Sequence, residues 1–291
     1  MTKYYKKYGK KYPIIDTHMH IGVNPLTTFT ENDLIPAMDR SGIDIQILFQ
    51  VNEGFTHETP SWNPFIGNDY IAKVQSMFPN RVIGLGMINP WWQAPKKYLF
   101  PLEKRGKVFD LVTESPALDE VERCIVKLGL WGLKMHPLLH GYHINTPEII
   151  DPILEKLTEL QRKVGRKLII VTHCMGDSIF NSPDALADVA ERFPELLFLA
   201  VHSGFVWGGF SLLNTIGKLE NVKLDLTTCS QRQVVYSVYE RYGAEKFTVG
   251  SDMPFATYEI ARAIVYDIFK KDEERELVLG GNIAKYLGLN Y

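Results

Sequence analysis

The sequence predicts one α/β domain folded as a single distorted (β/α)8 TIM barrel, and two observations carry this prediction. Eight short apolar segments alternate with longer segments whose apolar residues recur at i, i+3 and i+4, the spacing of an amphipathic helix. The chain has 291 residues, about the length that eight strand–helix units occupy in this fold. Strands that alternate with helices favour a parallel sheet, and eight such units favour a barrel over a doubly wound sheet.

The predicted strands are short and rich in Ile, Leu and Val. They cover residues 13–20, 43–51, 81–89, 130–136, 167–173, 196–202, 221–227 and 246–252. Helix start signals lie between them: Thr30, Ser115 and Ser182 precede amphipathic segments as N-cap residues, the two serines with a proline directly after. Glycines that can end a helix stand shortly before the next strand, at positions 42, 129, 165 and 243.

Residues 13–291 are predicted to form the barrel domain, and a basic, tyrosine-rich leader precedes it at residues 1–12. A long connection at residues 90–115 follows the third strand. Its aromatic residues favour an ordered loop over one mouth of the barrel. No linker or repeat divides the chain, so one domain is expected.

Composition and charge exclude several classes of function. A net charge of −2 offers no overall basic surface for nucleic acid or an anionic membrane, and no segment is apolar enough to span a bilayer. The three cysteines are scattered and odd in number, which indicates a reducing, cytoplasmic compartment rather than a disulfide framework. The expected partner is a small-molecule substrate, and a homodimer is compatible with the sequence.

Metal-binding residue types stand at the ends of five predicted strands. They are His18, His20, His136, His173, His202 and Asp252. In a parallel barrel, the C-terminal ends of all strands meet at the mouth that holds the active site. Because side chains alternate along a strand, Asp16, His18 and His20 are expected to share one face. Neutral imidazoles beside a carboxylate make a good site for a divalent metal ion.

Four of these strand ends carry short motifs: DTHMH in the first strand, VTHC in the fifth, VHSG in the sixth and VGSDMPF in the eighth. With the closing segment LVLGGNIAKYLGL, they resemble the metal-dependent amidohydrolase superfamily. The chain is most similar to the amidohydrolase-related branch that includes aminocarboxymuconate semialdehyde decarboxylase. The resemblance runs from about residue 13 to the end, and it leaves the leader and the 90–115 loop unexplained.

The resemblance implies one divalent metal ion held by His18, His20, His173 and Asp252. Zinc is the ion that it implies first, with manganese as the alternative. His202 would be the unliganded acid/base beside a bound water, and Asp252 would contact that water as well as the metal. Asp16 would lie behind the ligands and orient one of them.

Lys134 leaves a second arrangement open. Other branches of the superfamily use a carboxylated lysine at the end of the fourth strand to bridge two metal ions, and Lys134 stands on that strand. A single ion is favoured, because His136 follows on the same face and related sequences carry a Lys-x-His pair without a bridge. Lys134 and His136 are then expected to bind a substrate carboxylate.

Two reactions fit such a site. The main prediction is hydrolysis of a small polar substrate, such as a lactone, cyclic amide or ester, by a metal-activated water. The alternative is a nonoxidative, metal-dependent decarboxylase of an unsaturated or aromatic carboxylate. A decarboxylase should place an arginine near the metal, but the inward strand ends offer only Lys134, with Arg232 as the best substitute, and this favours hydrolysis. A third possibility is a binding protein that kept the barrel and lost catalysis. Such a protein should lack one of the metal-ligating residues, and none of them is missing from this sequence.

Overall fold

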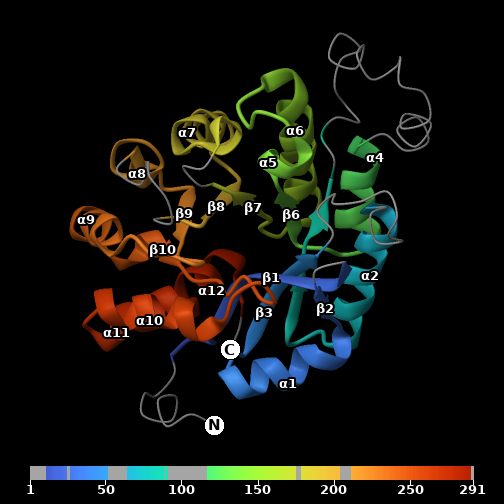
Figure 1. The fold of residues 1–291 in the computed structure, drawn as a ribbon. Helices are drawn as coiled ribbons and strands as arrows, with labels where there is room; N and C mark the ends of the chain where they lie inside the picture. The colour runs from blue at the N-terminus through green and yellow to red at the C-terminus, as the bar shows by residue number, and fades with distance from the viewer. Residues whose placement is uncertain are drawn as a thin grey trace.

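The strands form a ring and the helices surround it in the computed structural model of the chain (Figure 1). The structure describes residues 11–24, 27–51, 64–88, 90, 117–174, 178–203 and 211–289. Residues 1–10 of the predicted leader, residues 91–115 of the predicted loop and the predicted N-cap at Ser115 lie outside these described residues.

All eight predicted strands are present in the ring. Their order is β1 (Ile15–Asn24), β3 (Ile45–Gln50), β4 (Val82–Gly84) continued by β5 (Gly86–Met87), β6 (Gly132–Met135), β7 (Ile169–His173), β8 (Leu197–Val201), β9 (Val222–Asp225) and β10 (Phe247–Thr248). The paired strands of the ring are parallel. A short strand, β2 (Thr27–Phe29), extends β1 in the antiparallel sense.

Backbone hydrogen bonds join the ring where the regular ladders stop. Leu85 alone separates β4 from β5, and its N–H donates to Leu48 O at 2.9 Å, so these two strands act as one. On the other side, the segment after β10 meets β1, where the N–H of Asp252 donates to His18 O at 2.9 Å. The predicted (β/α)8 barrel is confirmed, with an irregular seam between β10 and β1.

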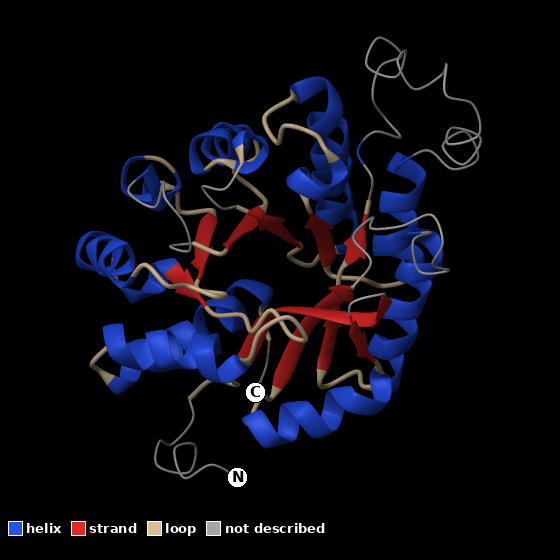
Figure 2. Ribbon diagram, in the orientation of Figure 1, coloured by secondary structure: helices blue, strands red, loops and turns tan. Residues whose placement is uncertain are grey.

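Most helices lie outside the ring of strands, and α12 (Asn282–Leu287) lies behind its opening (Figure 2). The other described α-helices are α1 (Glu31–Ser41), α2 (Pro64–Met77), α4 (Ala117–Glu122), α5 (Pro137–His140), α6 (Pro147–Val164), α7 (Pro183–Arg192), α8 (Ser211–Asn214), α9 (Arg232–Tyr242), α10 (Tyr258–Ile268) and α11 (Asp272–Glu276). Thr30 and Ser182 are N-cap residues as predicted, and Gly42 and Gly165 end their helices with φ of 70° and 66°. None of the described helices is long and apolar enough to cross a membrane.

Two apolar layers hold the barrel together. The outer layer lies between strands and helices. The inner layer fills the barrel with Ile, Val, Leu and Phe side chains from the strands, among them Ile47, Phe49 and Val171. Ile283 and Leu287 of α12 pack in this inner layer and close one end of the barrel. Burial of this area is the main stabilising contribution to the fold.

An irregularity in β1 decides which of its side chains point inward. The pairing with β3 shifts register between Asp16 and Met19. Ile15 packs in the inner layer and Met19 in the outer one, although strict alternation would put both on the same side. A bulge therefore lies between them. The prediction that Asp16 shares the inward face of His18 and His20 is wrong, because this bulge turns Asp16 outward.

Candidate active site

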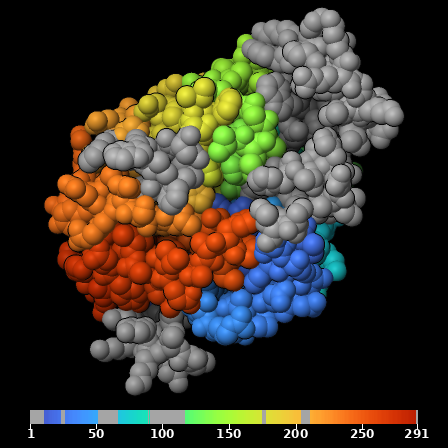
Figure 3. Space-filling model, in the orientation of Figure 1, coloured from blue at the N-terminus to red at the C-terminus, as the bar shows by residue number. Residues whose placement is uncertain are grey.

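The C-terminal ends of the strands surround a cavity of about 250 Å³. It is lined by His18, His20, Val51, Lys134, His136, Leu138, Leu139, His173, His202, Asp252 and Phe255. Every residue predicted as a metal ligand, as the acid/base or as a contact of the substrate carboxylate through Lys134 and His136 lies in this lining. These residues come from three strands, β1, β6 and β7, and from the segments that follow β6, β8 and β10. In the space-filling view, this end of the barrel is hollowed between the green segment around α5 and the orange segment after β10 (Figure 3).

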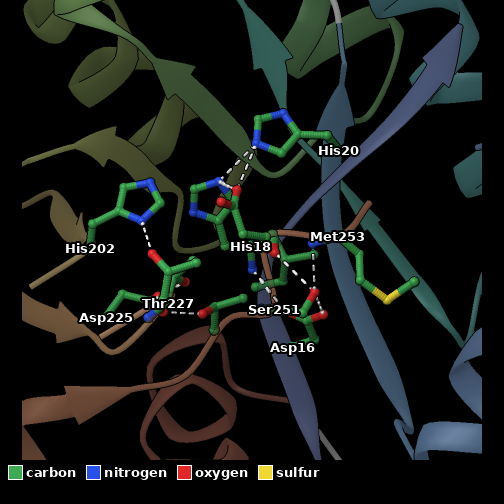
Figure 4. Close-up of polar contacts among 12 residues, drawn as sticks. Asp16, His18, His20, His202, Asp225, Thr227, Ser251 and Met253 are labelled. Carbon is green, nitrogen blue, oxygen red and sulfur yellow. Dashed lines mark hydrogen bonds and ion pairs between the residues drawn. The ribbon is translucent and has the colours of Figure 1, made fainter. Parts of the chain in front are cut away.

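Three donor atoms meet in the cavity wall. His18 Nε2 lies 3.0 Å from His20 Nε2, and Asp252 Oδ1 lies 3.3 Å from each nitrogen (Figure 4). A tetrahedral ion with bonds of about 2.1 Å separates its ligand atoms by about 3.4 Å. These three atoms, here called the metal trio, therefore have the spacing and the chemistry to hold one divalent ion.

Three further histidines line the same cavity. His202 offers a ligand atom within 4.8 Å of those of His18 and Asp252. The ring centre of His173 lies 4.8 Å from that of His202, and His136 stacks on His173 at 4.2 Å. The structure thus brings His202 to the metal trio and places His173 beside His202. The assignment of His173 as the fourth ligand and of His202 as the acid/base stays a prediction.

Burial sets the protonation states of these residues. Burial lowers the pKa of His18 well below its ordinary value, and the charge of Lys134 lowers it further. The pKa of His202 is lowered to about 3, chiefly by burial. Burial would raise the pKa of Asp252, but the hydrogen bond from His20 and the charges of His20, His202 and Lys134 together outweigh this effect, and the pKa is lowered. Neutral imidazoles and an ionised carboxylate are the forms that bind a metal ion.

Asp16 supports the main chain that carries the ligands. Its carboxylate accepts hydrogen bonds from His18 N–H at 3.1 Å, from Ser251 N–H at 2.9 Å and from Ser251 Oγ at 2.5 Å. Burial raises the pKa of Asp16 to about 7, although these hydrogen bonds act to lower it. The prediction that Asp16 lies behind the ligands and orients one of them stays a prediction, and its contacts reach the main chain of His18 rather than the imidazole.

Strained backbone marks the same mouth of the barrel. Among the described non-glycine residues, three have a positive φ: His202 (65°), Thr228 (50°) and Asp252 (61°). They follow β8, β9 and β10. Such conformations are unfavourable, most of all for a β-branched residue, and persist only where the surrounding structure imposes them. Sequence reasoning assigned no role to Thr228, since neither its φ nor its contacts leave a signal in the local pattern.

A second buried carboxylate holds the turn that carries Thr228. Asp225 at the end of β9 accepts hydrogen bonds from the hydroxyls of Thr17, Thr227 and Thr248, the last at 2.8 Å. It also accepts from Thr227 N–H at 3.0 Å. Burial raises the pKa of Asp225, although these hydrogen bonds act to lower it. Asp225 is not among the residues that line the cavity, so we give it a structural role.

The structure distinguishes the two cations considered for substrate binding. Lys134 is fully buried, lines the cavity, and places Nζ 4.7 Å from the ring centre of Phe49, a cation–π distance. Arg232 begins α9 instead, is half exposed, and forms an ion pair with Asp267. The suggestion that Arg232 could serve the site is wrong, because that residue is not part of the cavity lining.

Comparison with known proteins places the chain among enzymes. A family model described as amidohydrolase (Amidohydro_2) matches residues 101–289. Among curated proteins, the chain is 25% identical over 299 aligned positions to the 2-amino-3-carboxymuconate-6-semialdehyde decarboxylase of Dictyostelium discoideum. That alignment covers 88% of this chain and 76% of the relative.

Solved structures of similar fold include two decarboxylases. The 5-carboxyvanillate decarboxylase of Sphingomonas paucimobilis gives a TM-score of 0.67 at 16% identity, over 96% of this chain and 100% of that chain. A second structure is a dihydroxybenzoic acid decarboxylase of a Polaromonas species, with bound manganese and the inhibitor 2-nitroresorcinol. It gives a TM-score of 0.65 at 14% identity, over 96% of this chain and 98% of that chain. At these identities the likeness establishes the fold alone.

Proposed function

Since the chain belongs to the amidohydrolase family, we propose that it is a metal-dependent carboxy-lyase, which removes carbon dioxide from an unsaturated or aromatic carboxylate without an oxidant. The curated relative from Dictyostelium discoideum, similar over most of both chains, is a decarboxylase. Decarboxylation is the alternative prediction from the sequence, and we now prefer it to the main prediction, hydrolysis.

The observation that carries the proposal is a small cavity that is lined both by a buried cation, Lys134, and by apolar side chains. A substrate carboxylate next to Lys134 would form charge-assisted hydrogen bonds, which offset the cost of burying that ammonium group. His136 is the second proposed contact of the carboxylate. Val51, Leu139 and Phe255 line the same cavity and provide the apolar contacts that a flat, unsaturated substrate requires.

The ligands that we assign to the metal are His18, His20, His173 and Asp252. When bound, a divalent ion supplies Lewis-acid polarisation of a substrate or water oxygen. Zinc is the proposed ion, and manganese, the ion named for the Polaromonas structure, is the alternative. One ion is proposed rather than two, because the Lys134 ammonium lies against the ring of Phe49.

His202 is the proposed proton carrier. In decarboxylation, the bond between the carboxylate carbon and its neighbour breaks, and the electron pair stays on the neighbour. That carbon then takes up one proton while carbon dioxide leaves. His202 is neutral and buried beside the metal trio, so it can accept a proton from water and donate it to this carbon.

The purified chain, with zinc or manganese added, tests this proposal. We would assay it against hydroxybenzoates and muconate-type carboxylates for release of carbon dioxide, and against lactones and cyclic amides for ring opening. Carbon dioxide release that disappears in His18→Ala is the expected result. Metal-dependent ring opening without carbon dioxide would instead favour hydrolysis.

A further inference from the structure

We propose that Thr228 is a positioning residue, which accepts a hydrogen bond from His202 Nδ1–H and so keeps the Nε2 lone pair of this imidazole toward the metal trio. The inference rests on the proposed acid/base role of His202. Beyond that role, it identifies Thr228 as the hydrogen-bond acceptor and Nδ1–H as the tautomer of neutral His202.

The direction of the hydrogen bond follows from what each ring nitrogen faces. Thr228 Oγ1 lies 2.9 Å from His202 Nδ1, and Nε2 is the nitrogen left to face the metal trio. A neutral imidazole has one N–H and one lone pair, and the proposed acid/base role needs the lone pair on the nitrogen that faces the site. The hydrogen is then on Nδ1, and the hydroxyl of Thr228 accepts it.

The remaining ring nitrogen faces the site. In the close-up view, one nitrogen of His202 is bonded on the side of Thr227, and the other points away from that side (Figure 4). A ligand atom of His202 lies within 4.8 Å of those of His18 and Asp252. His202 therefore begins the reaction as a proton acceptor. With the opposite tautomer it would present an N–H to the metal trio, where it could neither bind an ion nor take a proton.

The backbone of Thr228 supports the same assignment. Its φ of 50° is costly for a β-branched residue, and such strain is retained mainly at functional positions. The turn cannot relax because it is bonded on both sides. Thr227 N–H donates to Asp225 Oδ1 at 3.0 Å, and Cys229 N–H donates to Leu226 O at 3.1 Å. This strained conformation brings the hydroxyl of Thr228 to His202.

Three variants separate positioning from general structural effects. Thr228→Val keeps the branched shape and the backbone strain but removes the hydroxyl, whereas Thr228→Ser keeps the hydroxyl. Thr248→Val is the matched control, because it removes from a neighbouring strand a buried threonine hydroxyl whose hydrogen bond goes to Asp225 rather than to His202. We expect kcat to fall about tenfold in Thr228→Val, with KM and bound metal unchanged, and to change less than about threefold in the other two.

Nitrogen-15 NMR of the zinc-loaded full chain shows which ring nitrogen of His202 carries the hydrogen, and this measurement does not depend on catalytic activity. The signals of His202 are those that disappear in His202→Asn, and we expect a protonated Nδ1 and an unprotonated Nε2. A protonated Nε2, or equal kcat in Thr228→Val and Thr228→Ser, would overturn the inference. If the chain proves to catalyse a different reaction, the NMR result still decides the role of Thr228.

Discussion

Gly250 lies against His18 with no room for a side chain. A Cβ at Gly250 would be 2.4 Å from the Cβ of His18 and 2.4 Å from the hydroxyl oxygen of Thr227, closer than Cβ atoms approach other atoms. This close approach brings the segment after β10 onto β1. It lets Asp252, two residues later, reach His18 Nε2 at 3.3 Å.

Gly250→Ala should therefore disturb the metal trio. Something must move to admit the methyl group, and we expect at least about tenfold weaker metal binding. Overpacking should also lower the free energy of unfolding by about 1–3 kcal/mol. Metal content after dialysis and urea unfolding would measure both effects.

Gly129→Ala is the control for this experiment. Gly129 has a φ of 68°, and a Cβ added there would have nothing within 4 Å, so alanine should cost about 1 kcal/mol through backbone strain alone. Its metal content should match that of the unmodified chain. Equal metal binding by Gly250→Ala would show that β1 adjusts without displacing His18.

The proposed ligands and the proposed acid/base residue should respond differently to substitution. His18→Ala and Asp252→Asn should lose both metal and activity, because each removes an atom of the metal trio. His202→Asn should keep the metal and lose about 10² to 10⁴ in rate, the usual contribution of a positioned acid/base. Metal analysis beside steady-state kinetics would separate the cases. Loss of about half the metal in His202→Asn would make His202 a ligand.

Lys134→Met tests the proposed carboxylate contact. Methionine keeps the packing against Phe49 but removes the charge, so KM should rise about 10- to 100-fold, the range for a lost charge-assisted hydrogen bond. The control is Arg232→Met, which removes an exposed cation outside the cavity and should leave KM unchanged. A fall in metal content in Lys134→Met would favour the bridged arrangement with two ions.

Lys246 should make stability depend on pH away from the active site. Burial lowers its pKa to about 7, and its ammonium donates to Leu219 O. Between pH 7 and the ordinary lysine pKa of 10.5, the unfolded chain binds more protons than the folded one. The free energy of unfolding should therefore gain up to about 1.4 kcal/mol per pH unit from this group as pH rises.

Lys246→Met should remove that gain. Urea unfolding at several pH values from 7 to 10 would compare the slope of this variant with that of the unmodified chain. The unmodified chain should show the steeper rise of the free energy of unfolding with pH. Near pH 7 its excess slope should fall to about half of the maximum, because Lys246 is half protonated in the folded chain there. Parallel slopes would mean that Lys246 keeps its ordinary pKa in the folded protein.

Local sequence was sufficient to predict the strands, the described caps and the polar residues that line the cavity. The apolar segments ending in His173 and His202 predict buried strands, and Thr30 and Ser182 mark helix starts through contacts within one turn. Parallel strands in a barrel end at one mouth, so the chain order alone places their last residues together. These inferences succeed because each depends on neighbouring residues or on the closed geometry of the fold.

The sequence by itself therefore determined the barrel and the side chains at its mouth, whereas only the tertiary structure decided how they are held. The bulge that turns Asp16 outward arises where β1 pairs with β3. The bond of Thr228 to His202 joins residues 26 positions apart, and Gly250 approaches His18 from the opposite end of the chain. Such relationships depend on contacts between distant segments, and those contacts override the local preferences that a sequence pattern reports.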